Sequence, residues 1–119
     1  MFLRTTGLIV GIVLWGTATA PAYTLQGTHL RESCQEATSP GGPTDRDRAF
    51  KAGWCLGYVL GKSEDGPLRG ICVPPSVTAG HLARVVVRYL EVRPARLQAS
   101  AGEVANEALL DAFPCTPAP

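Results

Sequence analysis

The chain has 119 residues, 45% of them hydrophobic, with 11 basic and 10 acidic residues and a formal net charge of +1 at pH 7. This length allows one domain with a modest packed core. The two signs of charge are interspersed, and no basic block exceeds two residues. The sequence therefore lacks the basic footprint of a nucleic-acid-binding protein and the polybasic patch of a protein that binds a membrane surface.

The N-terminus has the layout of a secretory signal peptide, with a short positive start, an uncharged apolar stretch and then small residues. Its apolar centre, residues 8–15, is too short to span a bilayer, so an uncleaved membrane anchor is the less favoured alternative. Ala20 and Ala22 satisfy the small-x-small rule for a cleavage site. We therefore expect a signal peptide over residues 1–22 and an exported mature chain over residues 23–119, with no membrane attachment after cleavage.

All four cysteines, Cys34, Cys55, Cys72 and Cys115, lie in the expected mature chain. Four cysteines in a short exported chain indicate two disulfides. Their spacings of 21, 17 and 43 residues match no zinc motif, and there is no C-x-x-C pair. With only two histidines in the chain, we expect no metal site and no cofactor.

Two helices are predicted in the first half of the chain. Thr28 is a candidate cap for a helix over residues 29–37. Thr44, followed three residues later by Asp47, resembles a capping box and predicts a second helix that runs to about Lys62. The segment between the two helices is rich in proline and glycine, which separates them.

Two further helices are predicted in the second half. Thr78 is a good cap for a third helix, which Pro94 ends. Ser100 and Glu103 form a capping box for a fourth helix, which Pro114 ends. Because there is no internal repeat and no convincing pair of strands, we predict an all-α fold, a small disulfide-stabilised bundle of about four helices.

The order of the helices favours one disulfide pairing among the three that four cysteines allow. The third and fourth helices are joined by a short connection, so we expect them to be antiparallel neighbours. The start of one then lies beside the end of the other, which brings Cys72 to Cys115. Cys34 is left to pair with Cys55, mainly by elimination.

Glycines recur at every fourth position of the second helix, at Gly53, Gly57 and Gly61. Each glycine costs a helix interior about 1 kcal/mol relative to alanine, so the row must have a compensating role. We predict that it allows another helix of the bundle to pack closely. A glycine-lined dimer interface is the alternative.

An aromatic stripe, Phe50, Trp54 and Tyr58, also recurs at spacing four along this helix. A stripe of this kind most often belongs to the core. The alternative is an apolar pocket of a periplasmic carrier or chaperone-like protein, which would take up a small molecule or an unfolded chain.

No catalytic constellation is evident in the sequence. Catalysis by a side-chain base needs a nucleophile or a metal within its reach, and neither His29 nor His81 has such a partner in the sequence pattern. There is no phosphate-binding loop and no nucleophile elbow. We predict that the chain is not an enzyme, and an enzyme that uses His81 ranks last among the alternatives.

Three segments, "CLGYVLG", "CVPPSVTAGHLARVVVRYLEVRP" and "EALLDAFPC", follow the export signal in this order. Together they resemble the Rap/Tai family, the periplasmic immunity proteins that neutralise cell-wall amidase toxins of type VI secretion systems. The resemblance covers residues 34–115. It implies a helical periplasmic inhibitor, often a homodimer, that blocks the active-site cleft of a secreted amidase and has no catalytic activity.

The positions that match the family are interpreted as scaffold rather than contact residues. They are the four cysteines, Gly57, Tyr58, Pro74, Thr78, Tyr89, Leu90 and Phe113. The chain departs from the family at His81, where a glutamine is common, and at Gln98, near which a histidine is often found. These differences would alter which toxin is recognised.

The loop over residues 63–71 is the best candidate for entry into a cleft, because an inhibitor needs an exposed, irregular element. Its candidate partner-binding residues are Glu64, Asp65, Gly66 and Arg69. An ordinary solvated connection is the alternative for this loop.

Overall fold

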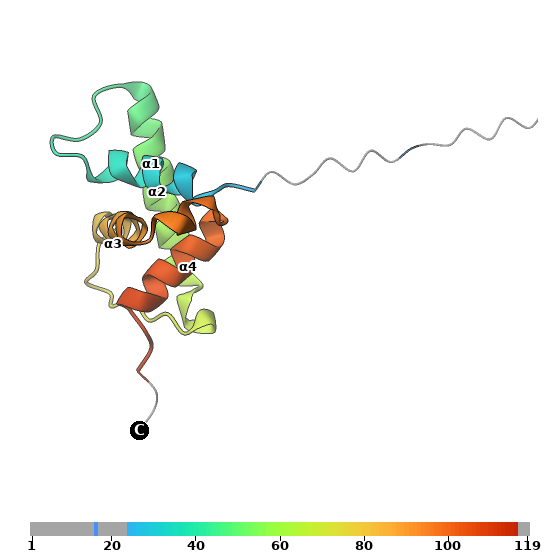
Figure 1. The fold of residues 1–119 in the computed structure, drawn as a ribbon. Helices are drawn as coiled ribbons and strands as arrows, with labels where there is room; N and C mark the ends of the chain where they lie inside the picture. Colours follow the sequence, from blue (N-terminus) through green and yellow to red (C-terminus); the bar gives the residue numbers. More distant parts are fainter. Residues whose placement is uncertain (1–15, 17–23, 117–119) are drawn as a thin grey trace, which may run out of the picture.

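The computed structural model describes residue 16 and residues 24–116, and this part forms four α-helices and two short 3₁₀ helices (Figure 1). The described residues form no strand and only two isolated bridges, Gln26 with Ser100 and Ile71 with Pro114. The all-α prediction is confirmed. The elements are α1 (Gly27–Thr38), α2 (Arg46–Glu64), η1 (Gly66–Arg69), α3 (Ala79–Val92), η2 (Pro94–Gln98) and α4 (Ala101–Ala112).

The predicted signal peptide, apart from Gly16, and its cleavage site lie outside the described residues. Within the described part of the chain, every helix is too short or too polar to cross a bilayer.

The caps of α3 and α4 are the predicted ones. The Thr78 hydroxyl accepts a hydrogen bond from the backbone N–H of His81 at 3.2 Å. The Ser100 hydroxyl accepts one from the backbone N–H of Glu103 at 3.3 Å, and Ser100 also donates to the Glu103 carboxylate at 3.1 Å. Both helices therefore begin where the local sequence satisfies their first free N–H groups.

The starts of α1 and α2 differ from the prediction. Helix α2 is capped by Asp45, whose carboxylate accepts from the backbone N–H of Arg48 at 2.9 Å, and not by Thr44. Helix α1 begins at Gly27 with no side-chain cap, so Thr28 lies inside it. The Gly27 N–H instead donates to the carbonyl of Ala99 at 2.8 Å. The start of α1 is thus fixed by a segment more than seventy positions away in the sequence.

The core lies where the four helices meet, and all four supply its fully buried side chains. The third helix buries Leu82, Val86 and Leu90, and the fourth buries Val104 and Leu109, on the faces that their apolar periodicity predicts. Burial of each such aliphatic side chain contributes about 1.5–3 kcal/mol.

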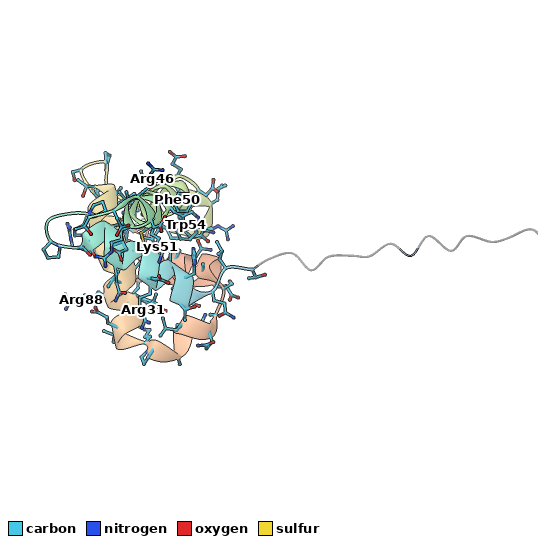
Figure 2. All side chains as sticks on the ribbon, turned by 90° about the horizontal axis from the view of Figure 1, so that it is seen from above. Arg31, Arg46, Phe50, Lys51, Trp54 and Arg88 are labelled. Carbon is cyan, nitrogen blue, oxygen red and sulfur yellow. A yellow bond between two sulfur atoms is a disulfide. The ribbon has the colours of Figure 1, made fainter. Side chains whose placement is uncertain are left out.

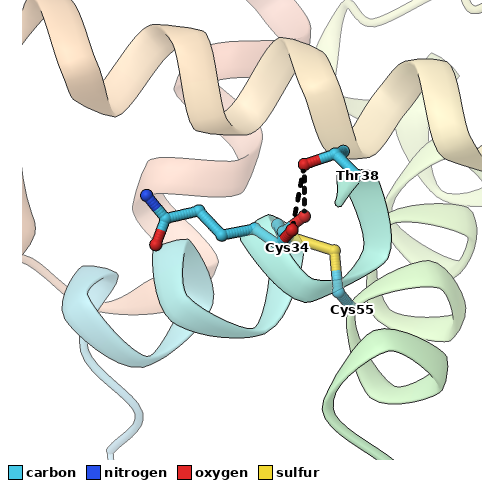
Figure 3. The surroundings of a disulfide bond; sticks show 4 residues. Cys34, Thr38 and Cys55 are labelled. Carbon is cyan, nitrogen blue, oxygen red and sulfur yellow. Dashed lines mark hydrogen bonds between the residues drawn. A yellow bond between two sulfur atoms is a disulfide. The ribbon is translucent and has the colours of Figure 1, made fainter. Parts of the chain in front are cut away.

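Two disulfides close the fold, with the predicted pairings. Cys34 of α1 is bonded to Cys55 of α2, and both residues are fully buried (Figure 3). The Thr38 hydroxyl donates to the carbonyl of Cys34 at 3.0 Å. Cys72, before α3, is bonded to Cys115, after α4. Disulfides of these loop lengths typically stabilise a domain by about 2–4 kcal/mol.

The predicted roles of the α2 glycines and aromatics are wrong in large part. A Cβ added at Gly53, Gly57 or Gly61 would meet no atom within 4 Å, so none of the other helices in the described residues packs against this row. Phe50 is 73% exposed, while Trp54 is only half-buried. The reason is that α2 turns a different side toward α1. That side is made of small or medium residues, Ala52, Cys55 and Val59.

Tyr58 is also half-buried, and its ring stacks on that of Trp54 with centroids 4.9 Å apart. His29 packs edge-on against Trp54 with the same centroid distance. The aromatic stripe therefore borders the core and does not form its centre.

A polar network joins α3, η2 and α4. The Glu107 carboxylate accepts from the Tyr89 hydroxyl at 2.9 Å and from two nitrogens of Arg96, at 2.9 Å and 2.5 Å. Burial raises the pKa of Glu107, but the hydrogen bonds from Arg96 and Tyr89 and the nearby positive charges outweigh it, so the net pKa lies below the ordinary value of 4.5.

Because the folded state lowers this pKa, the ionised network stabilises the fold above pH 4.5 and the contribution is lost as the pH falls through the acidic range. The free energy of unfolding of Glu107→Gln should therefore fall less steeply below pH 4.5 than that of the wild type. Urea unfolding at several pH values measures this, and Glu91→Gln, an exposed carboxylate on α3, is the control. Equal slopes for wild type and Glu107→Gln would contradict the assignment.

Leu109 and Leu110 form a matched pair for testing the core. Leu109 is fully buried and Leu110 is 44% exposed. Leu109→Ala should lower the free energy of unfolding by about 2–5 kcal/mol because it leaves a cavity, whereas Leu110→Ala should cost less than about 1 kcal/mol. Denaturant unfolding of the oxidised protein measures both, and similar losses would contradict this placement of the core.

Candidate functional site

The connection between α2 and α3 is a tightly closed loop at the end of α2 that contains η1 (Figure 1). The backbone N–H of Ile71 donates to the carbonyl of Gly66 at 2.8 Å, which closes the turn. Gly66 is buried, and a Cβ there would lie 2.7 Å from the Ile71 carbonyl oxygen. Gly70 has φ +77°, a left-handed conformation that glycine adopts without strain. The shape of the loop therefore depends on these two glycines.

The base of the loop is fixed to the end of the chain. The Cys72–Cys115 disulfide joins them covalently. The N–H of Cys72 donates to the carbonyl of Phe113 at 2.8 Å, and the N–H of Cys115 donates to the carbonyl of Gly70 at 2.9 Å. The side chain of Ile71, 1% exposed, anchors the loop in the core. The loop is thus held in one conformation before any partner binds.

The candidate partner-binding residues occupy different places in this loop. Glu64 is the last residue of α2 and Asp65 is its C-cap, so the helix extends beyond the predicted end at Lys62. Gly66 is buried and serves the shape of the loop, while Arg69 is exposed in η1. Asp65 and Arg69 therefore lie in the loop, whereas Glu64 lies on the exposed side of α2.

Leu68 is the residue that sequence reasoning missed. It lies in η1 between Pro67 and Arg69 and is 92% exposed, the highest value among the large hydrophobic side chains that are exposed in the described residues. A single exposed leucine needs no explanation on an ordinary surface. Leu68, however, lies in a turn whose base is fixed by a disulfide, and it forms a small exposed apolar site there. The only sequence signal was a second large apolar residue, besides Ile71, in the loop over residues 63–71.

His81 and the possible metal-binding side chains are the remaining candidates for chemistry. Among the described residues, no group of three or more His, Cys, Asp or Glu side chains is placed to hold a metal ion. His81 is exposed, and its nearest ring neighbour is Phe113, with centroids 6.2 Å apart. A surface hollow of about 320 Å³ lies beside Phe50 and Trp54 and is bordered by Asp47.

A known protein family matches most of this chain. The model of the Rap1a immunity proteins matches residues 26–115, which include all four helices and both disulfides. The chain belongs to the Rap1a immunity protein family. No curated protein and no solved structure matches it. Immunity proteins of this family are inhibitors of secreted effector toxins, and the family therefore suggests a binding function and no enzymatic one.

The closed loop predicts a difference between two glycines. Gly66→Ala should lower the free energy of unfolding by about 1–3 kcal/mol, because the added methyl group collides with the Ile71 backbone. Gly80→Ala, in the first turn of α3 with neighbours no nearer than 3.9 Å, is the matched control and should be neutral or stabilising. Thermal unfolding of both variants checks this, and an unchanged Gly66→Ala would show that the turn can relax.

Proposed function

We propose that this chain is a periplasmic immunity protein that binds and inhibits a type VI secreted peptidoglycan amidase by blocking its active-site cleft. The η1 loop is the element that enters the cleft. The mature protein, residues 23–119, acts without a cofactor after removal of the signal peptide over residues 1–22, and it forms a homodimer.

The observation that carries the proposal is the exposure of Leu68 on a fixed loop. Binding costs less conformational entropy when the loop is already ordered. Protein interfaces commonly have an apolar centre surrounded by a polar rim. Asp65 and Arg69 flank Leu68 and supply such polar groups.

The cysteines support the proposed compartment. All four are paired in disulfides, and the described residues contain no free cysteine. Disulfides persist in oxidising compartments such as the bacterial periplasm. An inhibitor that works there gains stability from two covalent links that a small core does not provide.

The surface hollow beside Phe50 favours a second candidate, a periplasmic carrier or chaperone-like protein. Its lining combines Phe50 and Trp54 with Asp47 and Lys51. A carrier would take up a hydrophobic dye while folded. An immunity protein would instead bind one protein partner tightly and leave the dye free.

Capture on the oxidised protein, followed by mass spectrometry, should retain a cell-wall amidase from extracts of the same organism under secretion-active conditions. With that amidase purified, Leu68→Ala should weaken inhibition of peptidoglycan hydrolysis more than tenfold, and Leu68→Asp should weaken it further. The reason is loss of the apolar contact at the centre of the interface.

The control is Val92→Ala. Val92 is 67% exposed at the end of α3 and lies outside the loop, so its replacement should leave inhibition unchanged. Circular dichroism establishes that each variant is folded. Equal inhibition by Leu68→Ala and wild type would remove the loop as the inhibitory element, and the absence of any amidase partner would contradict the proposed function.

A further inference from the structure

The outer face of α2 is exposed, apolar and uncovered by the rest of the described chain. We define this outer face by Phe50, Gly53, Gly57, Leu60 and Gly61, all of which are exposed. Phe50 is 73% exposed and Leu60 is 43% exposed, and a Cβ at any of the three glycines would meet no atom within 4 Å. Large apolar side chains beside open glycine notches form a surface that another helix can approach closely.

The two ends of the outer face carry opposite charges. Arg46 lies at the start of α2 and Glu64 at its end. They are eighteen residues apart, which is five turns of about 3.6 residues, so both lie on the same line along the helix. Both are exposed, and neither forms an ion pair with another described residue. Figure 2 shows Arg46 together with Phe50 and Trp54 on α2, away from Arg31 and Arg88.

This pattern is symmetric about residue 55. Positions 46 and 64 are equally distant from it, and so are positions 53 and 57. In an antiparallel pair of identical helices related by a two-fold axis, residues equally distant from the centre lie level with each other. Arg46 then lies level with Glu64 of the second copy, at both ends of the contact, and Gly53 lies level with Gly57 at its centre.

The sizes of the remaining side chains fit the same register. Phe50 and Leu60 lie on opposite sides of the central line, since successive residues turn by about 100°. Phe50 is thereby placed against Gly61 of the second copy, and Leu60 against Ala49, which is also exposed. Each large side chain thus meets a small residue, as close packing requires.

We propose that the outer face of α2 binds a second copy of this chain, antiparallel and centred on residue 55. The inference rests on the homodimer of the proposed function and adds its surface and register. The opposite charges at the two ends favour a second copy over other binding partners. A small apolar molecule or an unfolded chain would make no use of Arg46 and Glu64.

The arrangement leaves both inhibitory loops accessible. Each η1 follows α2 directly, about twelve residues from the centre of the contact. At a rise of 1.5 Å per residue, the two loops are separated by roughly 35 Å along the helix axis. Association of two copies and inhibition of the amidase therefore use separate surfaces.

A charge swap tests the register. The protein, purified from the periplasm, is examined by sedimentation equilibrium over a concentration series without amidase. Arg46→Glu and Glu64→Arg should each weaken the dimer at least tenfold, since each places like charges opposite each other at both ends. The double variant Arg46→Glu/Glu64→Arg should return to within threefold of the wild type.

Only a second copy explains such a rescue. Within one chain the two positions are roughly 27 Å apart along the helix, well beyond the screening length of about 8 Å at physiological salt. Arg84→Glu, an exposed position on α3, is the control and should leave the dimer unchanged.

A second variant tests the close approach. Gly57→Leu has open space in the single chain and replaces glycine with a better helix former, so the monomer should fold normally. In the pair the new side chain collides with Gly53 of the second copy, so the dimer should be lost. A wild type that stays monomeric at millimolar concentration would overturn the inference. A dimer that is unaffected by Gly57→Leu and by both single charge changes would overturn it as well.

Failure here is distinguishable from failure of the proposed function. A monomer that still inhibits an amidase through Leu68 keeps the function and loses this interface. A dimer with the predicted charge coupling that binds no amidase keeps the interface and loses the function.

Discussion

The closure of the chain at Cys72 and Cys115 is the constraint on which the functional part of the molecule depends. The disulfide and two backbone hydrogen bonds join the base of the η1 loop to the segment after α4. Without this closure, the four-residue turn would be held mainly by the buried side chain of Ile71 and the backbone hydrogen bond from Ile71 to Gly66. With it, the entropy of ordering the loop is lost on folding and need not be lost again on binding.

Helix α2 is divided into two sides with different roles. Its inner side, with Ala52, Cys55 and Val59, is covered by the core and by the bond to Cys34. Its outer side keeps Phe50 and the glycines exposed. No packing among the described residues offsets the cost of these three glycines, and the proposed contact with a second copy would offset it.

Local signals made much of the fold predictable. The hydroxyls of Thr78 and Ser100 cap their helices through residues three positions ahead, and an interaction that short can be read from the sequence. The start of α1 could not be predicted in this way, because the backbone N–H of Gly27 donates to the carbonyl of Ala99, which is distant in the sequence. The cap of α2 was displaced by one residue because Thr44 and Asp45 are both good candidates.

The side of α2 that faces the core was misjudged for a physical reason. Periodicity identifies the more hydrophobic side of a helix, but in α2 Phe50 lies on the outer side and Trp54 and Tyr58 only border the core. From the sequence, the candidate binding site could be predicted only as the loop over residues 63–71. The exposure of Leu68 results from a turn fixed by Cys115, more than forty residues later, and no local pattern contains that information.

The disulfides also join the cysteines in their order along the chain, first with second and third with fourth. A chain that crosses a membrane with its amino terminus first would present Cys34 and Cys55 to an oxidant before Cys72 emerges. At that moment the native bond is the only intramolecular bond that can form. Such a protein can reach its native pairing by thiol oxidation in chain order, without the slow reshuffling step that corrects a non-native bond.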